Sequence, residues 1–111
     1  MNLDWSNWTA MPSPERCKQI EGPEGSGVYQ VRNKRTKEFV LFGESVSCRK
    51  RMRSLFPKPY GTGTRNNENK RNYVLANWQD LEYRTVETQT KADAVIIDRY
   101  LKSLVNHKFN T

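Results

Sequence analysis

Asp98 and Arg51 are charged residues that helical periodicity places on or beside apolar surface. Asp98 lies four residues after Ala94 and three before Leu101, inside or beside the apolar stripe of a predicted helix. A carboxylate there is costly unless it meets a cation or a metal ion, although the spacing equally permits a surface ion pair with Lys102 one turn later. Arg51 lies at the edge of the apolar face of an earlier predicted helix, where its stem could instead cover core surface while its head stays in water. A partly buried Arg and Asp on two helices facing one sheet are the groups needed to hold a phosphate and its metal ion.

Other common chemistries have little support in this sequence. His107 is the only histidine, which argues against a Ser-His-Asp or Cys-His arrangement. Cys17 and Cys48 cannot complete a tetrahedral zinc site even with His107, and Cys48 falls on an apolar stripe where a buried thiol is expected. Residues 61–64 (Gly-Thr-Gly-Thr) are not a phosphate-binding P-loop, because no Gly-Lys-Ser/Thr follows.

The elements that must position these residues are helices and short strands. Strands are predicted over residues 27–33, 38–42 and 81–87, the first two joined by a basic turn at 33–36. Helices are predicted over 14–20, 46–55, 70–78 and 91–105, and residues 60–69 are expected to be a polar loop. This order predicts an α+β fold with a small three-stranded, mainly antiparallel sheet flanked by helices.

Helix-start signals and apolar stripes refine two of these helices. Ser45 or Ser47 is expected to cap the helix at 46–55, and Thr90 with Asp93 forms a capping box before the helix at 91–105. The predicted buried face of the first is Cys48, Met52, Leu55 and Phe56; that of the second is Ala94, Ile97, Leu101, Leu104 and Val105. Residues 1–22 are interpreted as an N-terminal arm that Trp5 and Trp8 pack against the domain at 23–111.

The positive charge of the chain is concentrated in residues 32–71. This segment holds twelve Lys or Arg against three Glu, a local balance of +9, whereas residues 1–31 sum to −2 and residues 72–111 to zero. Seven of the twelve are Arg, which suits bidentate contact with phosphate. The clustering favours nucleic acid as the partner, and a basic surface kept for solubility is the alternative. The residues predicted to contact nucleic acid are Arg32, Lys34, Arg35, Arg49, Lys50, Arg53, Arg65, Lys70 and Arg71.

A membrane is not an expected partner. No stretch approaches the roughly 18 apolar residues of a membrane span, and no basic amphipathic helix carries a broad apolar face. The N-terminus lacks the basic and apolar regions of a signal peptide, so we expect a reducing cytoplasm.

The spacing of several residues resembles that of the GIY-YIG nucleases. Gly27-Val28-Tyr29 resembles the first signature element on the first strand, and Leu41-Phe42-Gly43 stands where the second belongs. Arg51 matches the family's helical arginine, Asp98 its acidic helical residue, and Asn110 its terminal asparagine. The resemblance covers about residues 22–111.

The resemblance implies that a divalent metal ion, Mg²⁺ or Mn²⁺, assists hydrolysis of one phosphodiester strand of DNA, with branched or otherwise structured nucleic acid among the candidate substrates. It implies that Tyr29 is the general base or positions the water, and that Arg51 stabilises charge on the phosphate. It further implies that Asp98 binds the metal and that Asn110 holds the local geometry.

Two positions depart from the family pattern. Leu41 stands where the family usually has tyrosine, and Asp98 is one methylene shorter than the usual glutamate, which could leave its carboxylate about 1 Å short of an ideal metal position. These departures support an alternative, a nucleic-acid-binding module on the same fold that has lost the chemistry. A third possibility is a domain whose basic face docks an acidic protein partner.

Overall fold

The centre of the fold is an antiparallel sheet with the strand order β1-β4-β2-β3. The computed structural model describes residues 2–62 and 68–110, and within them the strands are β1 (Thr9–Ala10), β2 (Gly27–Asn33), β3 (Phe39–Ser45) and β4 (Leu81–Glu87). All three pairings are antiparallel. The predicted α+β class is confirmed.

The predicted number of strands is too low by one. The extra strand, β1, comes from the N-terminal segment and pairs with β4, with Thr9 opposite Tyr83 and Ala10 opposite Glu82. Two residues are too few to show the alternation of apolar and polar side chains by which a strand is recognised. The N-terminal segment thus extends the sheet, and Met11, Cys17 and Ile20 beyond β1 are buried in the core.

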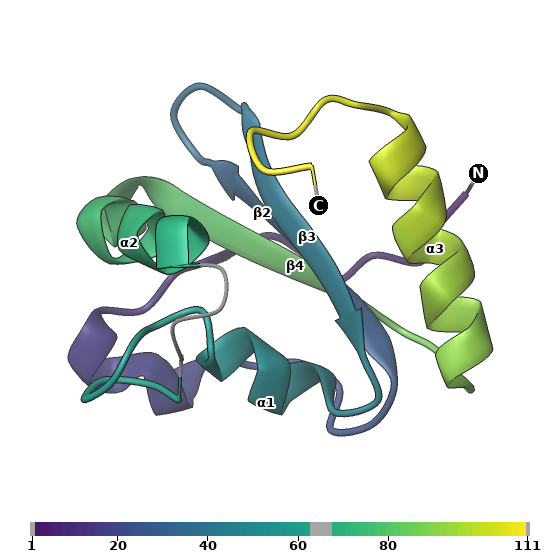
Figure 1. Ribbon diagram of the computed structural model, residues 1–111, viewed down its shortest axis with the longest axis horizontal. Coiled ribbons are helices and arrows are strands. Elements are labelled where there is room, and N and C mark those ends of the chain that lie inside the picture. Colours follow the sequence, from purple (N-terminus) through teal and green to yellow (C-terminus); the bar gives the residue numbers. More distant parts are fainter. Residues whose placement is uncertain (1, 63–67, 111) are drawn as a thin grey trace.

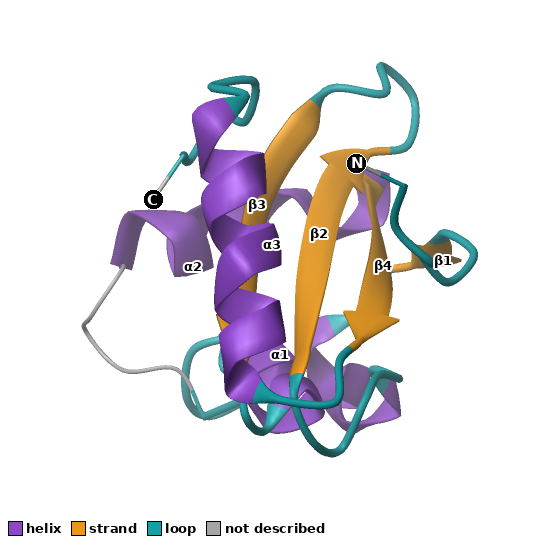
Figure 2. Ribbon diagram, turned by 90° about the vertical axis from the view of Figure 1, so that its right-hand side faces the viewer, coloured by secondary structure: helices purple, strands orange, loops and turns teal. Residues whose placement is uncertain are grey.

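Helices cover both faces of the sheet (Figures 1 and 2). Helix α3 (Lys91–Ser103) lies over one face, while α1 (Cys48–Arg53), α2 (Glu68–Asn77) and the 3-10 helix η1 (Pro14–Gln19) lie over the other; η2 (Trp78–Asp80) leads into β4. The core beneath α3 is Val28, Phe42, Val86, Ala94, Ile97 and Leu101. The opposite core includes Tyr29, Val31, Leu41, Cys48, Met52 and Phe56. No helix in the described part of the chain has the length and apolar character needed to cross a membrane.

Helix α1 is shorter than predicted, and neither expected serine caps it. Its first free N–H groups, those of Cys48 and Arg49, donate to the carbonyl oxygens of Gly25 and Pro23 at 3.0 and 2.8 Å. The Gly-rich segment before β2 therefore does the work of a side-chain cap. Ser47 makes no cap hydrogen bond. Because Leu55 and Phe56 are buried just beyond the helix end, the predicted apolar face is confirmed.

Helix α3 begins as predicted and ends earlier. The Thr90 hydroxyl accepts a hydrogen bond from the Asp93 N–H at 3.2 Å, and Ala94, Ile97 and Leu101 are buried as expected. The prediction that the stripe continues is wrong, since Leu104 and Val105 are 43% and 76% exposed. The reason is a change of chain direction: the helix ends at Ser103, and Val105 adopts a left-handed conformation with φ 49°.

After this turn, the C-terminal tail (residues 106–110) returns to β3 (Figure 1). The N–H groups of Lys108 and Phe109 donate to the carbonyl oxygens of Phe39 and Val40 at 3.1 and 2.8 Å. The His107 ring stacks on Phe39, with centroids 5.0 Å apart. The tail therefore covers the first part of the outer edge of β3, at Phe39 and Val40, and its described residues make no backbone hydrogen bond to the part that begins at Leu41.

Candidate active site

A pocket of about 290 Å³ lies beside the second half of β3. It combines residues from β2, from the edge strand β3 and from all three α-helices, so distant segments of the chain meet there. Its lining is Tyr29, Phe42, Gly43, Glu44, Arg51, Ser54, Leu55, Lys70, Arg71 and Asp98. Three of the four predicted catalytic residues, Tyr29, Arg51 and Asp98, are thus brought together.

Tyr29 is held against the floor of this pocket by the sheet register. It lies directly opposite Gly43 on β3 and is 5% exposed. A Cβ atom on Gly43 would overlap the phenol oxygen of Tyr29. Only glycine leaves room for the ring in this position, which explains the residue type at 43.

The environment of Tyr29 raises the pKa of its phenol to about 12. Burial is the main cause, because it penalises the phenolate. The positive charge of Arg51 and its hydrogen bond to the phenol act in the opposite direction and lower the pKa. Tyr29 and Arg51 are therefore electrostatically coupled, and the phenol carries its proton at neutral pH.

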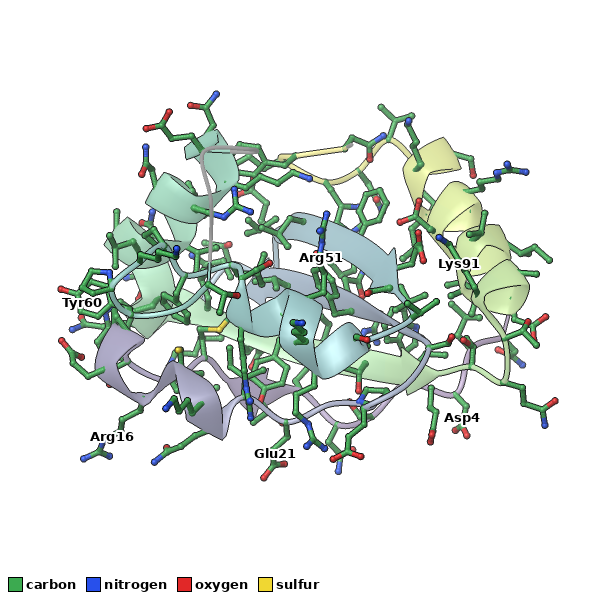
Figure 3. All side chains as sticks on the ribbon, turned by 60° about the horizontal axis from the view of Figure 1, so that its bottom comes forward. Asp4, Arg16, Glu21, Arg51, Tyr60 and Lys91 are labelled. Carbon is green, nitrogen blue, oxygen red and sulfur yellow. The ribbon has the colours of Figure 1, made fainter. Side chains whose placement is uncertain are left out.

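Arg51 projects from α1 toward the space between α2 and α3 (Figure 3). It is exposed, so the expectation that this arginine is partly buried is wrong. Arg51 lies in the last turn of a short helix, beside the pocket and not under the sheet, so its guanidinium group remains exposed to solvent. Exposure is compatible with contact to a large ligand, which would itself exclude water from the guanidinium.

Asp98 enters the pocket from α3 and shares it with Glu44. Asp98 is half-buried, and its pKa is raised by burial and by the negative charge of Glu44, while Lys102 and Lys70 lower it. Oε2 of Glu44 is buried without a hydrogen-bond partner among the described residues. Sequence reasoning missed Glu44; strand alternation, which puts it on the same face as Phe42, was the available signal.

Lys70 and Arg71 line the pocket from α2. Arg71 is only 8% exposed, and its Nε donates to the Ser54 carbonyl oxygen at 2.8 Å. Burial lowers the pKa of both side chains, and the positive charge of Arg51 lowers it further. These two residues were predicted as general nucleic-acid contacts, and the structure places them beside Tyr29 and Asp98.

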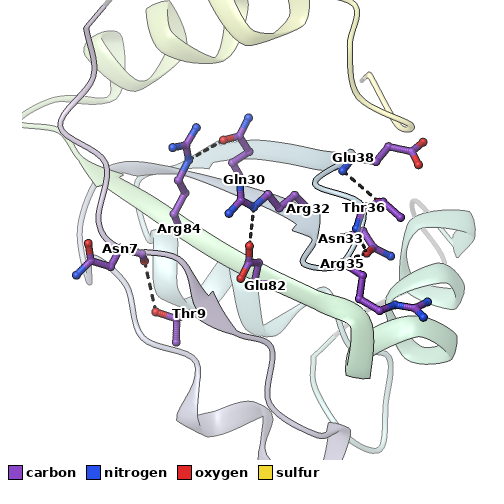
Figure 4. Close-up of polar contacts among 10 residues, drawn as sticks. All are labelled: Asn7, Thr9, Gln30, Arg32, Asn33, Arg35, Thr36, Glu38, Glu82 and Arg84. Carbon is purple, nitrogen blue, oxygen red and sulfur yellow. Dashed lines mark hydrogen bonds and ion pairs between the residues drawn. The ribbon is translucent and has the colours of Figure 1, made fainter.

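The remaining predicted basic contacts lie outside this pocket, and several have carboxylate partners. Arg32 pairs with Glu82 at 2.5 Å (Figure 4), and Arg35 pairs with Asp80 at 3.1 Å. The clustered charge of the hairpin is thus partly compensated by acids from around β4. Arg32 also lies over the Trp8 ring, 3.9 Å from its centroid.

Two arginines of α1 hold the N-terminal segment. Arg49 donates to the Gly22 carbonyl at 3.0 Å and pairs with Glu24, and Arg53 donates to the Lys18 carbonyl at 2.8 Å. Lys34 and Lys50 are exposed. Arg65 lies outside the described residues, together with residues 63–64 and 66–67 of the predicted loop.

Asn110 does not line the pocket. Its Nδ2 donates to the Lys102 carbonyl oxygen at 2.8 Å, one turn after Asp98 on α3. The contact ties the C-terminal tail to the end of the helix that carries Asp98.

A larger, open hollow of about 1140 Å³ lies elsewhere, at the start of β2 and the end of β4. Exposed acidic residues at positions 4, 24 and 87 border it together with Arg49. Its acidic border disfavours a polyanion, so the pocket beside β3 remains the candidate site.

No model of a known protein family matches the sequence, and a search of curated proteins returns no match either.

Proposed function

We propose that this protein is a divalent-metal-dependent endonuclease that hydrolyses phosphodiester bonds in DNA. The observation that carries the proposal is the meeting of Tyr29, Arg51 and Asp98, from one strand and two helices, in one pocket. These are the residues that the resemblance to GIY-YIG nucleases selects. Their chemistry also fits a phosphate: one cation, one carboxylate and one hydroxyl face the same space.

Two carboxylates in the pocket support the binding of the metal ion that such a reaction requires, while the described residues contain no group of three or more His, Cys, Asp or Glu side chains that could hold one. Mg²⁺ prefers oxygen ligands, keeps several waters and is commonly held by one or two carboxylates. Asp98 and Glu44 supply two carboxylates, and Oε2 of Glu44 is buried with no partner in the described chain. Asp98 and Glu44 would therefore hold the cation. When bound, Mg²⁺ or Mn²⁺ supplies positive charge that polarises the phosphate and stabilises the leaving oxygen.

The protein residues would divide the remaining work. Water attacks phosphorus and forms the new P–O bond, while the bond to the leaving sugar oxygen breaks. Tyr29 orients the water and, as phenolate, accepts its proton; Arg51 donates hydrogen bonds to a non-bridging oxygen that gains negative charge. Burial raises the phenol pKa of Tyr29 to about 12, so the phenolate is a small fraction at neutral pH, and the charge and hydrogen bond of Arg51 act to increase that fraction.

An inactive DNA-binding module is the second candidate, and the position of Leu41 favours it. Leu41 is fully buried in the core, so no side chain at 41 replaces the hydroxyl that the family pattern provides. In this case the basic residues near the pocket bind DNA and no bond is cut. A DNA partner, including branched DNA, is common to both candidates, and we propose a cytoplasmic location because Cys17 and Cys48 are free thiols.

A supercoiled-plasmid nicking assay with Mg²⁺ tests the proposal. The parent is expected to nick, and Arg51→Ala is expected to reduce the rate by at least 100-fold, a typical cost of removing one group that stabilises the transition state. Arg16→Ala, an exposed arginine on η1 outside the pocket, is the matched control and keeps the parent rate. Salt-dependent binding with no cleavage of plasmid, branched or single-stranded substrates supports the binding module and contradicts the nuclease.

A further inference from the structure

Arg71 is a buried arginine whose role in the pocket the proposed function leaves unexplained. The side chain lines the pocket of Tyr29 and Asp98 and is only 8% exposed. Its Nε is bonded to the Ser54 carbonyl, whereas Nη1 is buried and has no hydrogen-bond partner among the described residues. A buried charged donor without a partner costs free energy, so a ligand that accepts a hydrogen bond there would recover it.

The orientation of Arg71 is set by contacts that also involve the helix of Arg51. Ser54 accepts the Arg71 Nε–H through its carbonyl oxygen and donates from its hydroxyl to the Arg51 carbonyl at 2.5 Å. One residue at the end of α1 thus connects the backbone of Arg51 with the side chain of Arg71. With Nε fixed, the rest of the guanidinium is held at the pocket wall.

The surrounding charges favour an anion as this ligand. Burial is the main cause that lowers the pKa of Arg71 and of Lys70, and the positive charge of Arg51 lowers both further by repulsion. Three cationic side chains from α1 and α2 therefore converge on one pocket, while the acids Glu44 and Asp98 enter from β3 and α3. An anion between the three cations would relieve this repulsion.

We propose that Arg71 binds the reacting phosphate group of the DNA strand, donating from Nη1 to a non-bridging oxygen while Arg51 contacts the phosphate from the pocket rim. The inference rests on the proposed function in that it takes phosphate as the ligand of this pocket. It adds a second guanidinium, from α2, that belongs to none of the signature elements of the resemblance. Two arginines on separate helices fix the orientation of the phosphate as well as its charge.

Inorganic phosphate is the probe for a first test, because it requires no catalysis. The thermal unfolding midpoint is measured with increasing phosphate and with chloride at equal ionic strength, and the phosphate-specific rise reports binding to the folded state. Arg71→Gln is expected to weaken phosphate binding at least tenfold, and Arg16→Gln to leave it unchanged. A phosphate-specific rise of equal size in Arg71→Gln and the parent overturns the proposal, as does a parent that shows no rise.

Arg71→Lys guards against loss of folding in the glutamine variant, since it keeps the charge and most of the side-chain volume. A single ammonium on a flexible stem does not reproduce the Ser54 contact and the phosphate contact of a planar guanidinium. We expect weakened phosphate binding and a nicking rate at least tenfold below the parent with unchanged salt dependence of DNA binding. Parent-like values of phosphate affinity and rate in Arg71→Lys overturn the proposal.

The two experiments separate this inference from the proposed function. Phosphate binding that depends on Arg71 in a protein that never nicks DNA supports the inference and contradicts the nuclease. Nicking that is lost in Arg51→Ala and retained in Arg71→Lys supports the nuclease and contradicts the inference.

Discussion

Tyr29 and Gly43 face each other across β2 and β3, and the tyrosine ring occupies the space that any side chain at 43 would need. This pair joins the two segments in which the signature-like elements occur. The position of the phenol oxygen in the pocket therefore depends on a residue that contributes no side chain.

Replacing Gly43 with alanine is expected to displace Tyr29. The new methyl group would force the ring to move or the strands to separate, at a cost of about 1–3 kcal/mol in the free energy of unfolding. Urea unfolding measures this cost, and nicking activity should fall with it. Gly25→Ala is the control, because a Cβ there has no heavy atom within 4 Å and should change stability by less than about 0.5 kcal/mol. Equal effects of the two substitutions would contradict this account.

The pKa of Tyr29 predicts how the nicking rate depends on pH. With a folded-state pKa of about 12, the phenolate fraction grows tenfold per pH unit throughout the neutral range. If Tyr29 accepts the proton, the logarithm of the single-turnover rate rises with a slope of about 1 between pH 6 and 9. A flat profile at saturating metal assigns Tyr29 to positioning of the water alone.

Binding of the divalent cation should be linked to the ionisation of Asp98. Burial and Glu44 raise the pKa of Asp98, so protons compete with the cation at low pH, and affinity for Mn²⁺ should rise as pH increases through this pKa. Thermal shift with Mn²⁺ at several pH values measures this. Asp98→Asn should weaken binding by about tenfold or more and Glu44→Gln by a smaller factor, because a neutral side chain loses the charge of the ligand. Glu15→Gln, at an exposed residue of η1, is the control, and its affinity for Mn²⁺ should equal that of the parent.

His107 should make the folded state less stable in mild acid. Burial and the nearby positive charge of Arg84 lower the pKa of His107 from 6.5 to about 4. The side-chain amide nitrogen of Gln30 lies 2.9 Å from Nε2 of the His107 ring. Between these pH values the unfolded chain binds more protons than the folded one. The free energy of unfolding is therefore expected to fall by about 2 kcal/mol as the pH decreases from 6.5 to 4. Urea unfolding of the parent and of His107→Gln at pH 7 and pH 4.5 tests this. Since His107 is the only histidine, a pH dependence that is equal in both proteins would assign the effect to carboxylates.

Local sequence patterns predicted the parts of this structure that local forces determine. The Thr90 cap, the buried face of α3 up to Leu101, and the strands around Tyr29 all follow from spacing and residue type. The periodicity could not reveal that α3 stops at Ser103, because Leu104 continues the apolar pattern beyond the point where the chain turns back.

The parts that escaped prediction depend on contacts between distant segments. Glu44 was not predicted, and Arg71 was predicted only as a general nucleic-acid contact. Only tertiary packing puts a buried atom of each, without a hydrogen-bond partner among the described residues, beside the pocket. Strand β1 exists because β4 offers an edge to it, and the start of α1 is capped by carbonyls from a remote loop. Such features require knowledge of which segments meet.

The contacts of the C-terminal tail with Phe39 and Val40 also bear on how fast the molecule assembles. The β2–β3 hairpin is local in sequence and can form early, whereas the tail and β1 must reach partners from the other half of the chain. Closing such long loops costs entropy before any stabilising contact forms. The tail and β1 are therefore expected to pair with β3 and β4 late in folding. Substitutions in the tail should then accelerate unfolding while leaving the folding rate nearly unchanged. The two outer edges of the sheet would be among the last parts of the molecule to become native and among the first to open.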